Sequence, residues 1–156
     1  NLPMSEGLKK GRKGIPARNG IKLTSNNVME VIEFIRYDDG RFDILNGFDE
    51  MRLYGMAVGA RGGVGSTYNA SLRTYQKIYN AVIAGDLEQA RAAQQESVDI
   101  VHVIINHGGG IRGGKAIMKL IGIDCGDCRL PLAPYTEAEI ARLDEELRAI
   151  GFKGFE

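Results

Sequence analysis

A lysine interrupts a short apolar run near the start of the chain, in the segment GIKLTS at residues 20–25. The run has the composition of a buried strand, where a lysine is rarely found without a partner or a chemical role. A strand would place Lys22 and Thr24 on the same face, because strand side chains alternate. Polar residues at the carboxyl end of a strand are typical of the reactive end of parallel α/β folds. Lys22 is therefore a candidate nucleophile.

The reactivity of an amine nucleophile depends on its surroundings. A lysine attacks a keto carbon only when it is neutral, and an ordinary lysine is neutral at pH 7 in about one molecule in 2,500. Removal from water disfavours the charged form, so we expect Lys22 to lie desolvated, between Ile21 and Leu23. The alternative is a lysine that extends from the strand end into solvent and has no chemical role.

Two later segments could bind a polar ligand. Asp49 and Glu50, in NGFDE at 46–50, offer up to four carboxylate oxygens to the hydroxyls of a sugar. Their alternative role is to stabilise the N-terminus of a helix. In GVGST at 63–67, the glycines let the backbone approach a ligand, and Ser66 can donate or accept a hydrogen bond. This segment lacks the lysine and the spacing of a P-loop.

The cysteines and histidines do not form a metal-binding pattern. Cys125 and Cys128 lie in a Gly- and Asp-containing segment with no second cysteine pair nearby, so we expect two free thiols in a loop. His102 and His107 lack the HExxH spacing, and we expect packing or helix-end roles for them. No metal and no other cofactor is therefore expected.

Strand and helix patterns alternate in the first part of the chain. Strands are expected over three segments, 20–25, 42–48 and 59–67, and each is followed by a helical pattern. Asn26 or Asn27 can cap the first of these helices. The third helix is expected over 71–86, with an apolar face formed by Leu72, Tyr75, Ile78, Tyr79 and Val82. This alternation predicts a parallel sheet with right-handed crossovers.

The second part of the chain has helical patterns throughout. They cover three segments, 87–109, 115–122 and 136–151. The last begins with a capping box at Thr136 and Glu139, and its apolar stripe is formed by Ile140, Leu143, Leu147 and Ile150. We therefore predict an α/β fold in which residues 1–86 form part of a barrel and residues 87–156 form helices packed on it. Three parallel strands leave two edges uncovered, which favours the end of a larger barrel.

Composition limits the classes of protein to which the chain can belong. It has 156 residues, of which 44% are hydrophobic and 26% charged, enough for one domain with a real core. Twenty basic residues balance twenty acidic ones, and the short basic segment at 9–13 is typical of a solvated helix end. We expect neither nucleic acid nor a membrane as a partner. No apolar leader opens the chain, and a cytoplasmic location is expected.

The segments GIKLTS, LNGFDE and GARGGVGSTYN occur in this order at 20–25, 45–50 and 59–69. They resemble the ends of the sixth, seventh and eighth strands in the N-acetylneuraminate lyase branch of the family that also contains dihydrodipicolinate synthase. The tail at 109–134 resembles that family's C-terminal helices, and the resemblance extends over nearly the whole chain from about residue 19. The family consists of class I aldolases built on a (β/α)₈ TIM barrel, so the fold expected is its last three strands with their helices.

The resemblance implies roles for individual residues. Lys22 would form a Schiff base with pyruvate, and the residues that bind the open-chain sugar would be Thr24, Gly47, Asp49, Glu50 and Ser66. The reaction implied for the full-length parent is retro-aldol cleavage of N-acetylneuraminate to N-acetylmannosamine and pyruvate. Its substrates are pyruvate and 2-keto-3-deoxy sugar acids. Arg52 and Arg61 stand where an apolar residue and a small or acidic residue would be expected.

Other parts of the expected machinery do not occur in this sequence. The family's Gly-rich loop for the pyruvate carboxylate and its proton-shuttling tyrosine should lie upstream, and the chain does not begin with methionine. We therefore expect a fragment with little or no activity alone, which forms a homo-oligomer or pairs with the missing N-terminal half. Two alternatives stay open: a split or engineered half-barrel whose role is structural, and a related pyruvate-dependent aldolase such as dihydrodipicolinate synthase.

Overall fold

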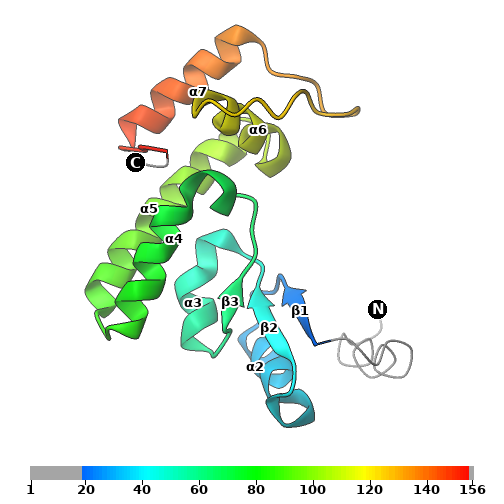
Figure 1. Ribbon diagram of the computed structural model, residues 1–156, viewed down its shortest axis with the longest axis vertical. Helices are drawn as coiled ribbons and strands as arrows, with labels where there is room; N and C mark the ends of the chain where they lie inside the picture. The colour runs from blue at the N-terminus through cyan, green and yellow to red at the C-terminus, as the bar shows by residue number, and fades with distance from the viewer. Residues whose placement is uncertain (1–18, 155–156) are drawn as a thin grey trace.

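A three-stranded parallel sheet organises the first part of the molecule. The computed structural model describes residues 19–154, so the basic segment at 9–13 lies outside it. The strands are β1 (Gly20–Leu23), β2 (Asp43–Asn46) and β3 (Gly62–Gly63), in the order β1-β2-β3. Both pairings are parallel, which confirms the predicted α/β class (Figure 1). β3 is much shorter than expected, because its glycines provide no side chains to pack against a neighbour.

Helix α2 (Val28–Arg36) covers one face of this sheet. Its N-cap is Asn27, one of the two caps that the sequence predicts. The Asn27 side chain accepts a hydrogen bond from the amide of Glu30. A hydrophobic cluster joins the helix to the sheet and consists of Leu23, Val31, Phe34, Phe42 and Ile44. The short helix η1 (Tyr37–Gly40) then leads into β2.

The connection after β2 contains the arginine that the sequence places at an apolar position. It consists of η2 (Asp49–Met51) and α3 (Arg52–Ala57). Arg52 is buried, and its Nη1 donates a hydrogen bond of 2.8 Å to the carbonyl oxygen of Gly62 in β3. Burial lowers the pKa of this guanidinium, an effect that Tyr68 and Tyr79 oppose. The position of Arg52 is thus buried, as expected for an apolar residue, and a specific hydrogen bond satisfies the arginine found there. Arg61, by contrast, is exposed and pairs with Asp43.

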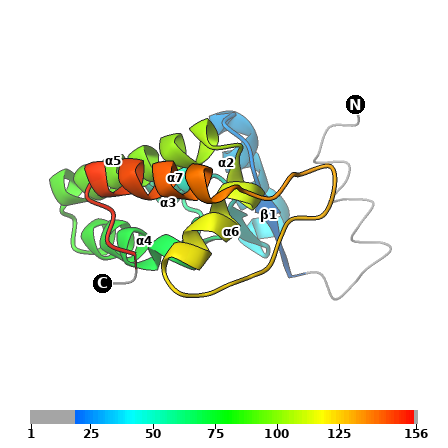
Figure 2. The same cartoon turned by 90° about the horizontal axis from the view of Figure 1, so that it is seen from above.

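Helices α4 (Tyr68–Ile83) and α5 (Leu87–Asn106) run side by side and connect the sheet to the rest of the chain (Figures 1 and 2). The turn between them contains Gly85 at φ +74°, and Asp86 caps α5 through the amide of Gln89. The apolar face predicted for α4 is only partly correct. Tyr75 and Ile78 are buried, but Leu72 is 47% exposed and Tyr79 is 45% exposed.

Helices α6 (Gly110–Leu120) and α7 (Glu137–Ala149) lie at the opposite end of the molecule from the sheet (Figure 1). Their core contains Ile100 and Ile104 from α5, Ile117 from α6, and Leu143 and Leu147 from α7. The predicted capping box of α7 is present. Of its predicted stripe, Ile150 is exposed because it follows the last helical residue. The boundary expected between 86 and 87 falls at the α4–α5 turn and remains a prediction.

The other face of the sheet has no helix on it within residues 19–154. Lys22, Leu45 and Gly62 are paired across the three strands, so the side chains of Lys22 and Leu45 share this face with the bare backbone of Gly62. Lys22 and Thr24 are exposed, and Val64 just beyond β3 is 44% exposed. The sheet therefore has one packed face and one open face. None of the described helices is long and apolar enough to cross a lipid bilayer.

Candidate functional site

Three of the predicted site residues meet at the carboxyl ends of β1 and β2. The amide of Gly47 donates a hydrogen bond of 2.9 Å to the carbonyl oxygen of Leu23, which continues the pairing beyond the strands. A Cβ atom at Gly47 would lie 2.9 Å from Cε of Lys22 and closer still to Oγ1 of Thr24. Only glycine leaves room for these two side chains. The structure therefore brings Lys22, Thr24 and Gly47 together on the open face.

Lys22 is exposed, whereas we expected it to be desolvated. The reason is the alternation of the strand: Leu23 is buried against α2, and Lys22 points to the opposite face. Nothing within residues 19–154 covers that face. A second element would have to cover the open face before Lys22 could have the surroundings that amine catalysis requires.

Asp49 is buried, and its carboxylate is held by the loop before α4. Its Oδ2 accepts hydrogen bonds from the amide of Thr67 at 3.0 Å and from its Oγ1 at 2.6 Å. Its Oδ1 is also buried but has no partner in the described structure. Gly65 lies directly against this carboxylate. Oδ2 of Asp49 is thus occupied by Thr67, and Oδ1 is buried beneath Gly65 without a protein partner, while Glu50 remains half-buried beside it.

A chain of buried hydroxyls supports Asp49 from α4 and α5, and sequence reasoning missed it. The hydroxyls of Thr67 and Tyr75 are hydrogen-bonded, and Ser97 Oγ lies 3.0 Å from the Tyr75 hydroxyl. The carbonyl oxygen of Asp49 also accepts from Ser97 at 3.3 Å and from Gln94 at 3.4 Å. Burial raises the pKa of Tyr75, which keeps its phenol protonated as a donor. The feature of the sequence that could have indicated this chain of hydroxyls is Ser97, a polar residue on the apolar face of α5.

Ser66 is exposed and lies toward α6. A Cβ atom at Gly110, the first residue of α6, would be 3.2 Å from Ser66 Oγ. The predicted residues thus form two groups, one at the ends of β1 and β2 and one at the start of α4.

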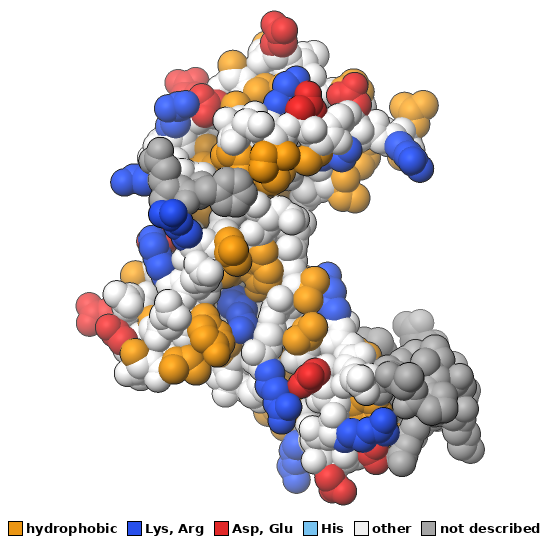
Figure 3. Space-filling view, viewed as in Figure 1, with side chains coloured by type: hydrophobic (Ala, Val, Ile, Leu, Met, Phe, Trp, Pro, Cys, Tyr) orange, Lys and Arg blue, Asp and Glu red, His pale blue; other side chains and the backbone are white. Residues whose placement is uncertain are grey.

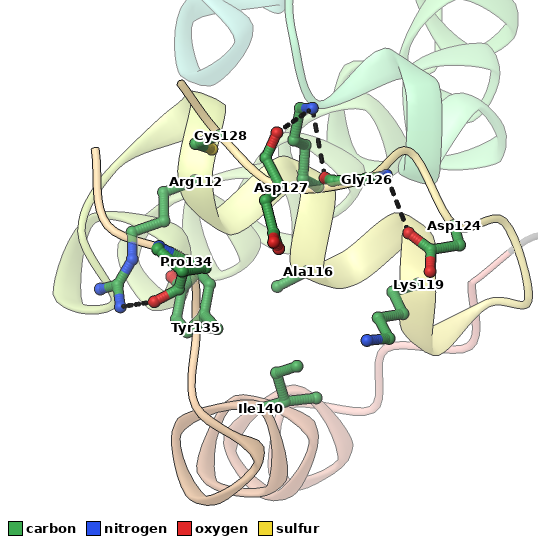
Figure 4. Close-up of a pocket in the computed structure, with 11 residues that line it drawn as sticks. Arg112, Ala116, Lys119, Asp124, Gly126, Asp127, Cys128, Pro134, Tyr135 and Ile140 are labelled. Atoms are coloured by element: carbon green, nitrogen blue, oxygen red, sulfur yellow. Dashed lines mark hydrogen bonds between the residues drawn. The ribbon is translucent and has the colours of Figure 1, made fainter. Parts of the chain in front are cut away.

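A polar cleft of about 250 Å³ between α6 and α7 is a second candidate for a binding site (Figure 4). Two of its three basic side chains are already occupied, and the third, that of Lys119, is exposed. Arg112 donates to the carbonyl oxygens of Ala133 and Pro134, and it lies over the ring of Tyr135. Lys115 donates to three carbonyl oxygens, those of Cys125, Gly126 and Asp127. These cations hold the segment between the helices in place.

The cysteines lie in a loop as expected, and of the two histidines His107 has a side-chain contact, with Glu146. Cys125 and Cys128 are free thiols in that segment. His107 Nε2 lies 3.0 Å from Glu146, and its carbonyl oxygen accepts a hydrogen bond from Tyr135, whereas His102 is exposed. Among residues 19–154, no three side chains of His, Cys, Asp or Glu are grouped to hold a metal ion.

Glu139 should control the acid stability of this C-terminal end. The backbone amide of Thr136, followed by Arg112 and the Thr136 hydroxyl, lowers the pKa of Glu139 to about 2. A lowered carboxyl pKa adds stability above the ordinary value of 4.5, and this contribution is lost as the pH falls toward 2. We expect Glu139→Gln to reduce the loss of melting temperature between pH 6 and pH 2.5.

Glu145→Gln is the matched control for that experiment, because Glu145 is exposed on the same helix. It should leave the acid-induced decrease unchanged. If the wild type and Glu139→Gln lose the same number of degrees between the two pH values, Glu139 does not have the assigned role.

Comparison with known proteins places this geometry in a family. The family model described as the dihydrodipicolinate synthetase family matches residues 12–150. The chain belongs to this family. It is 34% identical over 131 residues to the N-acetylneuraminate lyase of Rhizobium meliloti (strain 1021), an alignment that covers 84% of this chain and 43% of the relative. It is also 34% identical over 141 residues to the N-acetylneuraminate lyase of Gallus gallus, covering 89% of this chain and 46% of the relative.

Solved structures of family members show the same architecture. The N-acetylneuraminate lyase of Proteus mirabilis superposes with a TM-score of 0.91 at 32% identity, over 98% of this chain and 52% of that one. The enzyme of Aliivibrio salmonicida gives a TM-score of 0.90 at 35% identity, over 98% and 51%. This chain thus spans about half the length of the relatives it matches.

Proposed function

We propose that this chain is the carboxyl-terminal half of a Schiff-base aldolase that cleaves N-acetylneuraminate, with Lys22 as the nucleophile. The observation that carries the proposal is the meeting of Lys22, Thr24 and Gly47 on the open face of the sheet, at the carboxyl ends of adjacent parallel strands. Relatives named N-acetylneuraminate lyase, at 34% identity, favour this substrate over the other substrates of the family.

In the proposed reaction, the neutral Lys22 amine adds to the C2 keto carbon of the open-chain sugar acid, one proton is taken up from solvent and water leaves, giving an iminium ion; the final hydrolysis returns that proton. The C4 hydroxyl loses its proton and the C3–C4 bond breaks. Its electron pair moves into an enamine, and N-acetylmannosamine departs as the aldehyde. Protonation at C3 and hydrolysis of the imine then release pyruvate and restore the amine. Thr24, Gly47, Asp49, Glu50 and Ser66 bind the sugar hydroxyls in this proposal.

The proposed partner is the amino-terminal half of the same barrel. It would pair with the free edges of β1 and β3, cover Lys22, and supply the pyruvate-carboxylate loop and the proton-shuttling tyrosine. The isolated chain would then have little or no activity. A cytoplasmic location is part of the proposal, since free Cys125 and Cys128 suit a reducing compartment.

The test is reductive trapping of the imine. After incubation with pyruvate and borohydride, we expect weak labelling of the isolated chain, because Lys22 is exposed and lacks the desolvated surroundings that amine catalysis requires. Peptide mapping by mass spectrometry should place the adduct on Lys22, and Lys22→Ala should abolish it. Lys119→Ala, which removes an exposed lysine on α6, is the matched control and should be labelled like the wild type. An adduct spread evenly over the surface lysines would contradict the assignment.

A second candidate function is structural self-association of the half-barrel. Exposed apolar residues on α4, namely Leu72, Tyr79 and Ile83, favour it, and hydrophobic side chains are visible at the surface over α3 and α4 (Figure 3). Two-fold pairing is the commonest closed arrangement. This alternative expects a dimer by light scattering at tens of micromolar and no imine at Lys22. The trapping experiment therefore separates the two functions.

A further inference from the structure

A second cavity, of about 340 Å³, lies between the start of α4 and helix α6. Its wall is mainly apolar and includes Ala70, Ile104 and Ile117, all of them buried, together with the half-buried Met118. Ser66 and Asn69 line it as well. An apolar cavity of about 150 Å³ can hold a benzene molecule. This one has the volume for a substituted ring.

Ser71 gives the cavity an unsatisfied hydrogen-bonding group. It lines the cavity and is 2% exposed, yet its Oγ has no hydrogen-bond partner in the described structure. The backbone at Ser71 departs from helical geometry, with φ −131° and ψ 29°, which bends α4 at this residue. A buried hydroxyl without a partner is costly and rare in folded proteins. A ligand oxygen would satisfy it.

Gly114 keeps the cavity open from the α6 side. It lies inside that helix and lines the cavity, and a Cβ atom built on it would meet no heavy atom within 4 Å. A glycine in a helix costs stability relative to alanine, and no close approach to Gly114 requires it. The missing side chain is therefore space that a ligand can use.

The polar groups of the wall favour an uncharged ligand. Lys115 is the cation among the lining residues, and its ammonium already donates to three carbonyl oxygens. No carboxylate lines the cavity. We propose that this cavity binds a small neutral aromatic alcohol, with its ring against Ile104, Ile117 and Met118 and its hydroxyl bonded to Ser71 Oγ. The inference goes beyond the proposed function, since Lys22 and Thr24 take no part in it. Ser66, a proposed sugar-binding residue, also lines the cavity, but the contacts proposed here do not involve it.

The experiment is a titration of the full chain with 4-methylphenol and with toluene, followed by saturation-transfer NMR. For a ligand of this size we expect a Kd of about 0.1–1 mM for 4-methylphenol. Ser71→Ala should weaken 4-methylphenol about two- to tenfold, the range for loss of one hydrogen bond, and should leave toluene binding unchanged. Lys22→Ala should bind both probes as the wild type does, so failure of the proposed function would not affect this result.

Two plugging variants test the location of the site. Gly114→Leu and the more flexible Gly114→Met place a side chain in the cavity and should weaken both probes at least tenfold, with the circular dichroism spectrum unchanged. Gly114→Ala is the control and should retain most of the binding. Wild-type affinity in a folded plugging variant, equal effects of Ser71→Ala on both probes, or absence of saturable binding would each overturn the proposal.

Discussion

When an amino-terminal half-barrel is added, pyruvate should be released from N-acetylneuraminate at least about 10⁴-fold faster than by the chain alone, whose rate should be at background. Loss of a general acid–base group typically costs about 10²–10⁴-fold, and loss of positioning can cost as much again. On the proposed assignment, the chain alone supplies the nucleophile and the sugar-binding residues but not the tyrosine or the carboxylate loop, and its nucleophile is exposed. Closure of the barrel would cover Lys22 and add the missing tyrosine and carboxylate loop.

The measurement combines the purified chain with the amino-terminal half of a related N-acetylneuraminate lyase and follows pyruvate continuously. Lys22→Ala with the same half should give background rates, whereas Lys119→Ala should give the wild-type rate, which excludes a general effect of lysine removal. Robust pyruvate release by the chain alone, lost in Lys22→Ala, would contradict the expectation. That result would mean that a second copy of the chain completes the site.

The strand positions and the shared face of Lys22 and Thr24 were predictable because they depend on local rules. Side chains alternate along a strand whatever surrounds it, and the register places Lys22 beside Leu45 as expected for parallel neighbours. The exposure of Lys22 was not predictable. It depends on whether another part of the protein covers the open face, which no local pattern in residues 20–25 encodes.

The surroundings of Asp49 show that local sequence patterns also fail to predict the partners of polar side chains. Its carboxylate partner Thr67 is 18 residues away, and Ser97, which donates to its carbonyl oxygen, is 48 residues away. Arg52 likewise depends on the carbonyl oxygen of Gly62, ten residues along the chain. The identity of these side chains was visible in the sequence, but their partners are set by the way β3 and α5 pack.

Leu72 and Tyr79 show where helical periodicity misleads. Both fit an apolar face at helical spacing, and both are nearly half exposed because only the part of α4 that carries Tyr75 and Ile78 faces α5 and α3. Periodicity identifies the apolar side of a helix. It does not tell which portion of that side the rest of the chain covers.

Gly65→Ala should destabilise the chain by about 1–3 kcal/mol, the range expected when a side chain is forced into a filled space. The added Cβ would lie 2.5 Å from Oδ2 of Asp49 and would overlap Oδ1. Asp49 cannot easily move aside, because Thr67 holds its carboxylate through two hydrogen bonds. The measurement is urea unfolding, where the midpoint should fall without a change in slope. Gly114→Ala, at a glycine with open space around it, is the control and should be neutral or stabilising by up to about 1 kcal/mol.

A double-mutant cycle with Asp49 separates a specific overlap from a general intolerance of the loop. In an Asp49→Ala background the carboxylate that the new Cβ would overlap is gone, so Gly65→Ala should cost less than about 1 kcal/mol there, and the coupling between the two positions should be at least about 1 kcal/mol. Equal costs in both backgrounds would show that Gly65 is required for another reason, such as backbone conformation in the β3–α4 loop. A large coupling would instead mean that the glycine is needed because the carboxylate lies against it, the arrangement that buries Oδ1 of Asp49 beneath Gly65 without a protein partner.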